Sequence, residues 1–244
     1  MSNYYHGAKA SKQATSVSTP VVADSSIHLI VGTAPVHTVG GKVNEPVYAS
    51  NYAEAVAAMG YSDEWDKYDI CEEIYSSFKL YSNGPIIMVN VLDPAKHLKG
   101  AETVEKTLAG GITELPYEAV SDTVEVKGYD GEDSLTETYT RGEDYDLFYT
   151  DGVLRLERIE SGKIKADNAR LNIKFNSVDP SKVTKKEIIG GYNTNTNKSS
   201  GFELVDSVYP KYGVIPTLFL APNFSTDSEV AAIMAAKAEN INGL

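Results

Sequence analysis

Few residues of this chain combine a reactive side chain with a useful spacing. The chain has four histidines, His6, His28, His37 and His97, and one cysteine, Cys71. None of the histidines has a partner at metal-ligand spacing, and Cys71 falls on the apolar face of a predicted helix. We therefore expect structural roles for these side chains, with no bound metal and no cofactor.

Two loops resemble ligand-binding motifs only loosely. Residues Val31–Pro35 follow a predicted strand, where a phosphate loop can lie, but they lack its spaced glycines and its Lys-Ser/Thr pair. Residues Asp130–Asp133 lack the ligand alternation and the closing Glu of a calcium loop. No Gly-x-Ser-x-Gly elbow is present, and 34 acidic residues offer no acid–base pair that can be selected without geometry. The sequence thus predicts no catalytic, cofactor-binding or metal-binding residue.

Composition narrows the class of protein. The chain has 244 residues, 42% of them hydrophobic and 23% charged, values that are ordinary for a soluble globular protein. Its formal net charge of -12 repels phosphate backbones and argues against nucleic-acid binding. The longest apolar runs, such as Ile86–Val89 and Val214–Ala221, are too short to span a bilayer. The start of the chain lacks the order of a secretory signal, so we expect folding in the cytoplasm.

The first third of the chain predicts an α/β unit. A strand over Ile27–Val31 precedes a helix that Asn51 and Glu54 begin with a capping box and that Gly60 ends. A second helix over 66–82 leads to a buried strand over Ile86–Leu92, which implies a parallel crossover. The side chains expected to face inward from the two helices are Tyr52, Val56, Met59, Ile70, Cys71, Ile74, Phe78 and Tyr81.

A block of short strands follows, from about Lys96 to Ser199. Asp130-Gly131 and Asp151-Gly152 predict hairpin turns. The segment Ala101–Leu108 is ambiguous and could be a short helix. Residues 192–198 predict a flexible loop that returns from this block. The predicted strands are Thr123–Lys127, Tyr145–Tyr149, Val153–Ile159 and Arg170–Phe175. This block predicts a small antiparallel barrel or sandwich.

The α/β pattern then returns. We expect a short helix that Pro210 ends, a buried strand over Val214–Ala221, and a last helix opened by Thr226 and Glu229. Pro216 within that strand favours a sheet edge or a bulge. The short helix should bury Phe202, Val205, Val208 and Tyr209, and the last one Val230, Ile233 and Met234, with Gly243 as its cap. Because a parallel sheet normally continues with a strand here, we expect a chain cut in mid-fold.

The opening 26 residues have no helical stripe and no hairpin signal. Plain disorder and an extended arm that completes a neighbouring subunit's sheet are both open. In the second case the linkage should lie in Lys12–Val22, with Val17, Val21 and Val22 as apolar anchors. The predicted fold class is an α/β core, mostly parallel with flanking helices, interrupted by an inserted β domain. The chain divides into the N-terminal arm (1–26), a first core segment (27–95), the inserted domain (96–199) and a second core segment (200–244).

Several motifs, taken in order, resemble the N-terminal half of the sheath proteins of contractile phage tails and phage-tail-like bacteriocins. They are Tyr4–Gly7, Val31–His37, Val43–Val47, Tyr52–Ala55, Met59–Asp63, Val89–Pro94, Val178–Thr184, Ile189–Tyr192 and Leu220–Ser225. The resemblance implies a structural subunit and not an enzyme. It implies partners as well: other sheath subunits in six-fold helical rings, an inner tail tube and a baseplate.

The resemblance also implies a mechanism and a location. Contraction of the sheath drives the tube through a target envelope, extended arms link subunits by strand exchange, and the inserted domain lies outside. Assembly would occur in the bacterial host cytoplasm, and the product would be part of a virion or tail-like particle. Family members continue past the position of Leu244. Two other classes stay open: a carbohydrate- or receptor-binding module that uses the inserted domain, and a small α/β enzyme with an unrecognised site.

Overall fold

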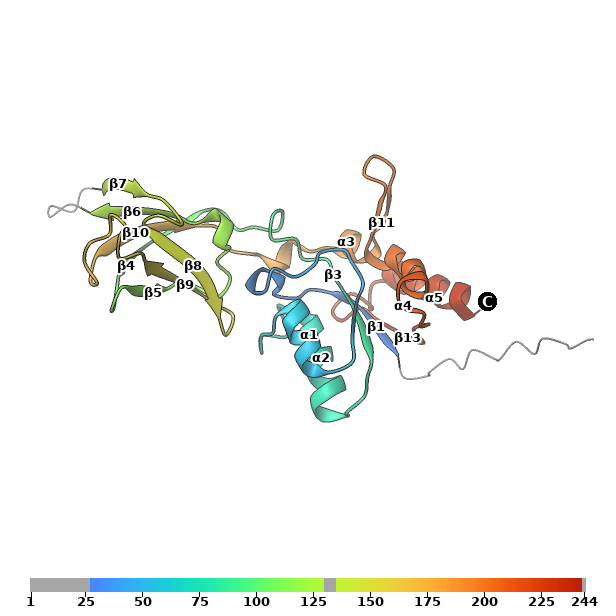
Figure 1. The fold of residues 1–244 in the computed structure, drawn as a ribbon. Helices are drawn as coiled ribbons and strands as arrows, with labels where there is room; N and C mark the ends of the chain where they lie inside the picture. The colour runs from blue at the N-terminus through green and yellow to red at the C-terminus, as the bar shows by residue number, and fades with distance from the viewer. Residues whose placement is uncertain (1–26, 130–134, 243–244) are drawn as a thin grey trace, which may run out of the picture.

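The computed structural model describes residues 27–129 and 135–242 (Figure 1). They form a mixed α/β structure with two regions. The α/β region contains the elements from β1 to β3 and from α3 to α5. The β-rich region, residues 102–175, lies at the other end of the molecule in Figure 1 and has its own hydrophobic cluster. The mixed α/β class predicted from the sequence is confirmed.

A four-stranded sheet forms the centre of the α/β region. Its strands are β1 (His28–Gly32), β2 (Val47–Ala49), β3 (Ile86–Asn90) and β13 (Leu218–Leu220), in the order β13-β1-β3-β2. Strand β1 runs parallel to β3, as predicted, and also to β13, whereas β2 pairs antiparallel with β3. Strand β2 was not expected from the sequence, and it makes the sheet mixed. Strand β13 lies at an edge, one of the two alternatives that Pro216 favours.

Helices cover both faces of this sheet, which explains the continuous apolar runs of its strands. Leu29 and Ile87 face a cluster with Phe202, while Ile30 and Met88 face the opposite cluster. Helices α1 (Tyr52–Met59) and α2 (Asp69–Tyr75) cover the second face. The 3₁₀ helix η5 (Gly201–Ser207) and helices α4 (Val208–Tyr212) and α5 (Ser228–Asn242) cover the first.

Two details of the first helices differ from the predictions. The second helix begins at Asp69, and after Tyr75 it continues as a π-helix, η2 (Ser76–Leu80), which shifts the side chains that follow. Tyr81 is therefore 77% exposed instead of buried. In α1, Met59 is buried and Tyr52 and Val56 pack partly buried against the same cluster, as predicted. Ala55, which lies outside the predicted stripe, is buried as well.

The C-terminal segment differs from the predictions in three places. Pro210 does not end a helix, because it lies within the first turn of α4, where its missing N–H costs nothing; Gly213 ends that helix. Tyr209 is exposed. The N-terminus of α5 is capped by Asp227, whose Oδ1 accepts hydrogen bonds from the N–H groups of Glu229 and Val230, and not by Thr226. The predicted cap at the other end, Gly243, lies outside the described residues.

The segment between the two regions also contains regular structure. The predicted return loop is a hairpin of β11 (Gly191–Asn193) and β12 (Lys198–Ser200), which projects from the α/β region in Figure 1. Before it comes α3 (Lys185–Ile189), opened by a capping box of Thr184 and Glu187. The remaining 3₁₀ helices are η1 (Val36–Thr38), η3 (Ser121–Thr123) and η4 (Pro180–Lys182).

The β-rich region packs two antiparallel sheets around one cluster that includes Leu156 and Ile173. The sheets have the orders β4-β10-β6-β7 and β5-β9-β8, and no closed barrel forms within the residues described. Ambiguous Ala101–Leu108 contains a strand, not a helix, and Asp151-Gly152 forms the predicted turn with positive φ at both residues. The strands are β4 (Glu102–Thr107), β5 (Ile112–Glu114), β6 (Glu125–Tyr129), β7 (Leu135–Tyr139), β8 (Tyr145–Thr150), β9 (Val153–Arg158) and β10 (Arg170–Phe175).

Candidate functional site

The residues predicted for the linkage between subunits lie outside the described residues of the chain. They are Lys12, Val17, Val21 and Val22. The loop Asp130–Asp133 lies outside them too. Over residues 27–129 and 135–242, no group of three or more His, Cys, Asp or Glu side chains could hold a metal ion.

The histidines, the cysteine and the loop that the sequence analysis considered for chemistry have structural surroundings. His28 Nδ1 lies 2.7 Å from Glu73 Oε1, and His97 Nδ1 accepts a hydrogen bond from the backbone N–H of Asp93. Cys71 is buried, and burial raises the pKa of its thiol to about 12. In the loop after β1, the N–H and the hydroxyl of Thr33 donate hydrogen bonds to Asp69 Oδ1.

The central sheet has two edges without a pairing strand among the residues that the structure describes. These are the outer edges of β2 and β13. Strand β13 is apolar in sequence, yet Leu218 is 43% exposed. An edge of this kind presents free N–H and C=O groups with which an added strand can pair.

The most elaborate polar arrangement is the junction between the α/β region and the β-rich region. His37, in η1, is buried, and its Nε2 donates a hydrogen bond to the backbone carbonyl of Tyr117 at 3.0 Å. The rings of Tyr117 and Tyr149 are nearly perpendicular to the imidazole, at 84° and 80°, with centroids 5.9 and 6.1 Å from it. One histidine of the α/β region is therefore held between two tyrosines of the β-rich region.

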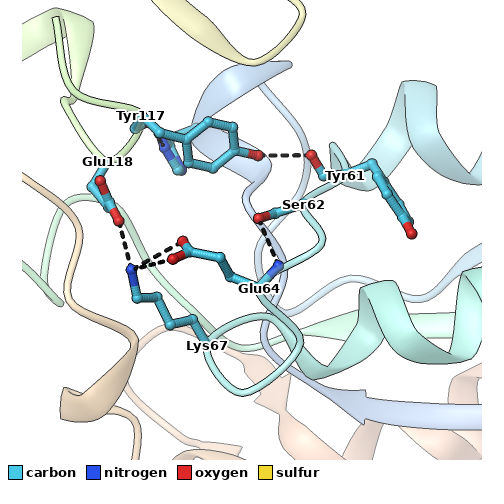
Figure 2. Close-up of polar contacts among 7 residues, drawn as sticks. Tyr61, Ser62, Glu64, Lys67, Tyr117 and Glu118 are labelled. Carbon is cyan, nitrogen blue, oxygen red and sulfur yellow. Dashed lines mark hydrogen bonds and ion pairs between the residues drawn. The ribbon is translucent and has the colours of Figure 1, made fainter.

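Tyr117 reaches across the junction (Figure 2). Its hydroxyl donates a hydrogen bond to the carbonyl of Tyr61 at 2.8 Å, and its ring packs against the cluster of the α/β region. Burial raises the pKa of the Tyr117 phenol well above its ordinary value, so the group stays a donor at any physiological pH. Gly152 is needed beside it, because a Cβ there would lie 2.5 Å from the Tyr117 ring. The β8–β9 turn thus packs closely against the ring of Tyr117.

An ion pair lies next to this contact. Lys67 Nζ is 2.9 Å from Glu118 Oε1 across the junction and 2.9 Å from Glu64 Oε2 on its own side, as Figure 2 shows. Burial alone would raise the pKa of Glu118, but the hydrogen bond from Lys67 and the smaller favourable influences around it outweigh burial and lower that pKa. This keeps Glu118 ionised at neutral pH.

Backbone contacts hold the connecting segments together. The N–H of Lys99 donates to the carbonyl of Ser177, and the N–H of Val178 donates to the carbonyl of Glu118, both at 2.8 Å. The junction therefore consists of two connecting segments and one loop, 115–121, that returns to the α/β region. These contacts can fix the orientation of the β-rich region relative to the α/β region. The contacts described above do not place a nucleophile beside a base.

Sequence reasoning missed the junction. A structural role was expected for His37, but without any partner for its ring. The contacts of His37, Tyr61 and Lys67 with 117–118 join residues 80, 56 and 51 positions apart, so no local spacing reports them.

Comparison with known proteins finds a relative that matches nearly the whole chain. No protein-family profile matches the chain. A protein named tail sheath protein, from Burkholderia phage BcepMu, is 28% identical to it over 244 residues. The resemblance to phage tail sheath proteins is confirmed. The match covers 99% of this chain and 48% of the relative, so the chain spans about half the length of the tail sheath protein it matches.

Spanning a bilayer requires a helix that is both long and apolar. None of the described helices combines the length and the apolar character that crossing a membrane requires.

Proposed function

We propose that this chain is a structural subunit of a phage tail sheath. The observation that carries the proposal is the similarity to the tail sheath protein of phage BcepMu along 99% of the chain. The arrangement of groups agrees with a structural role, because the most connected polar cluster joins two regions of the subunit and not a nucleophile to a base. We further propose that the protein is not an enzyme.

The surface of the β-rich region supports an outward position in an assembly. Its exposed faces carry paired charges, such as Arg170 with Glu105 at 2.7 Å and Arg155 with Glu114 at 2.9 Å. Cores of protein interfaces are depleted in charged residues. The β-rich region is therefore better suited to face solvent than to pack between subunits, and the inserted domain proposed at 96–199 would lie outside the sheath.

The α/β region is the better candidate for contacts between subunits. Its sheet has open edges at β2 and β13, among the residues described, and strand addition at such edges uses backbone hydrogen bonds. We propose that residues Lys12–Val22, within the arm 1–26, pair in this way with a neighbouring copy. Backbone pairing through a flexible arm would keep neighbours connected while rigid subunits rotate.

The complete function proposed is contraction. Subunits would form six-fold helical rings around an inner tail tube attached to a baseplate, in a kinetically trapped extended state. Repacking of the subunits would shorten the sheath and drive the tube through a cell envelope. Assembly would take place in the bacterial host cytoplasm, and the sheath would then belong to a phage or bacteriocin-like particle.

Antibody labelling tests the assignment directly. Antibodies raised against the purified chain are applied, with gold, to tailed particles from the bacterium that carries its gene. A sheath subunit predicts regular labelling along the whole tail shaft. Labelling at the tail tip alone would favour the receptor-binding alternative, and unlabelled tails would contradict both.

A deletion tests the linkage separately. Removing residues 1–22 from the full protein should leave the circular dichroism spectrum of the folded subunit unchanged but abolish polymers in negative-stain microscopy and light scattering. A substitution of Val17, Val21 and Val22 by Asp should do the same with the chain length preserved. Normal polymers from either variant would refute strand exchange by the arm. A glycan array with the same chain tests the carbohydrate-binding alternative.

A further inference from the structure

Among the residues that the structure describes, one nitrogen of the His37 imidazole has a hydrogen-bond partner and the other, which is buried, has none. A carbonyl oxygen can only accept, so Nε2, at 3.0 Å from the Tyr117 carbonyl, must carry the proton. In the neutral ring Nδ1 is then an unprotonated acceptor. Nδ1 is buried and has no hydrogen-bond partner among the described residues. The junction thus accommodates the neutral ring.

Protonation would change this balance. It would place an N–H on Nδ1 where the described residues offer no acceptor, and a full charge between the rings of Tyr117 and Tyr149. Burying an unpaired charge or donor costs free energy unless the surroundings move to solvate it. Burial is the main cause that lowers the pKa of His37 from its ordinary value of 6.5.

The charged groups around His37 do not offset this cost. Glu118 is the acidic neighbour that favours the charged ring, but Lys67 already occupies its Oε1 at 2.9 Å. Asp122 lines the groove beside His37, where Arg141 pairs with it at 3.4 Å. Tyr117 and Tyr149 are neutral phenols whose pKa values burial raises. On its own side of the junction, His37 is flanked in η1 by the uncharged Val36 and Thr38.

A groove beside His37 offers water a route to the ring, where it could accept a hydrogen bond from a protonated Nδ1. This groove of about 470 Å³ runs along the junction and is lined by residues 36–41 on one side and by 120–122 and Tyr149 on the other. Opening the junction along this groove would give Nδ1 a solvent partner. The motion would separate η1 from the loop that carries Tyr117.

We propose that His37 is an acid-sensitive latch: the neutral ring holds the β-rich region against the α/β region, and protonation releases it. This proposal does not depend on the sheath function. The device would let mild acid loosen the orientation of the two regions without unfolding either one.

Pulsed electron–electron double resonance, which measures the distance between two spin labels, tests the latch on the full chain. Spin labels are attached at Glu72→Cys in α2 and Glu157→Cys in β9, both exposed positions, in a Cys71→Ala background. The distance distribution is recorded between about pH 7.5 and about pH 4.5, a range that brackets histidine protonation. We expect a narrow distribution at the upper pH and one about twofold broader in acid, while the far-ultraviolet circular dichroism stays constant.

A neutral substitute provides the matched control. In His37→Gln the amide can still donate to the Tyr117 carbonyl but cannot titrate, so its distribution should stay narrow in acid; His37→Asn serves if the first variant does not fold. NMR titration of the imidazole signals identifies the pH at which His37 is protonated. The proposal is overturned if His37 takes up a proton without broadening, if it takes up none down to the lowest pH of the folded state, or if the neutral variant broadens equally.

Discussion

The carboxylate of Asp69, at the first position of α2, accepts a 2.6 Å hydrogen bond from the backbone N–H of Thr33, just beyond the end of β1. The Thr33 hydroxyl donates to the same oxygen at 3.1 Å. Asp69 is only 2% exposed, so the contact ties the crossover helix to the carboxyl end of the strand inside the protein. A sequence window cannot show it, because 36 residues separate the partners.

Replacing Asp69 by Asn should change how stability depends on pH. Burial raises the pKa of Asp69 from 3.8 to about 7, against the opposing hydrogen bonds from Thr33. The folded state therefore binds the proton more tightly than the unfolded chain, and this contribution to stability is lost as pH rises from about 4 to about 7. Asp69→Asn keeps the acceptor oxygen but cannot ionise.

The measurement is the free energy of unfolding in urea at several pH values. The difference between Asp69→Asn and the wild type should move in favour of the variant as pH rises through this window. His37 has the opposite sign, since its lowered pKa costs stability as pH falls, but it is common to both proteins and cancels in the difference. Parallel pH profiles would show that Asp69 is not protonated in the folded state near neutral pH.

Gly32→Ala should destabilise the same corner for a steric reason. A Cβ at Gly32 would lie 2.2 Å from Asp69 Oδ1, so the Asp69 side chain would have to shift away from its hydrogen bonds with Thr33. We expect a loss of about 1–3 kcal/mol, the usual cost of overpacking. Gly100→Ala is the matched control, because a Cβ there meets nothing within 4 Å. Equal midpoints for the two variants in urea would contradict the close contact.

The two hydrophobic clusters predict two cooperative units. Leu29 and Leu156 are both fully buried, but they belong to clusters with no residue in common. Leu29→Ala should lower the stability of the α/β region by about 2–5 kcal/mol, and Leu156→Ala that of the β-rich region by a similar amount. Trp65, the one tryptophan of the chain, packs against the first cluster, so its fluorescence follows that region.

Calorimetry with tryptophan fluorescence separates the outcomes. Each variant should shift one transition, and the fluorescence midpoint should move with Leu29→Ala alone. A single transition that both variants shift equally would show one cooperative unit and would argue against the proposed inserted domain at 96–199.

Local patterns predicted local structure well. Asn51 caps α1 as expected, with its Oδ1 accepting from the N–H of Glu54 at 3.0 Å, and the fully buried run of β3 was evident from its composition. The return bond of Glu54 goes to the N–H of Ser50, one residue before the expected partner. These features depend on neighbours within a few positions, which a sequence displays directly.

The misses depend on distant residues or on small changes of period. The π-helix after Tyr75 rotates the chain, so Tyr81 points to solvent despite a correct helical stripe upstream. The polar sequence of β4 has side chains exposed to solvent, and its partner β10 lies more than 60 residues further on. The junction of His37 and Tyr117 belongs to the same class, since only the folded chain brings its two sides together.

Tyr117→Phe should weaken the junction while leaving its packing intact. The variant keeps the ring that contacts His37 and Tyr68, but it removes the hydroxyl that donates to the Tyr61 carbonyl at 2.8 Å. We expect a loss of about 1 kcal/mol, because the partly buried carbonyl loses its partner and the net value of such a bond is of that order. Tyr209→Phe is the control, since Tyr209 is 54% exposed and belongs to α4, outside the junction.

The midpoint in urea should fall for Tyr117→Phe at an unchanged m-value and stay constant for Tyr209→Phe. If the two variants were equally stable, the contact with Tyr61 would contribute nothing, and the ring contacts of Tyr117 would have to hold the junction.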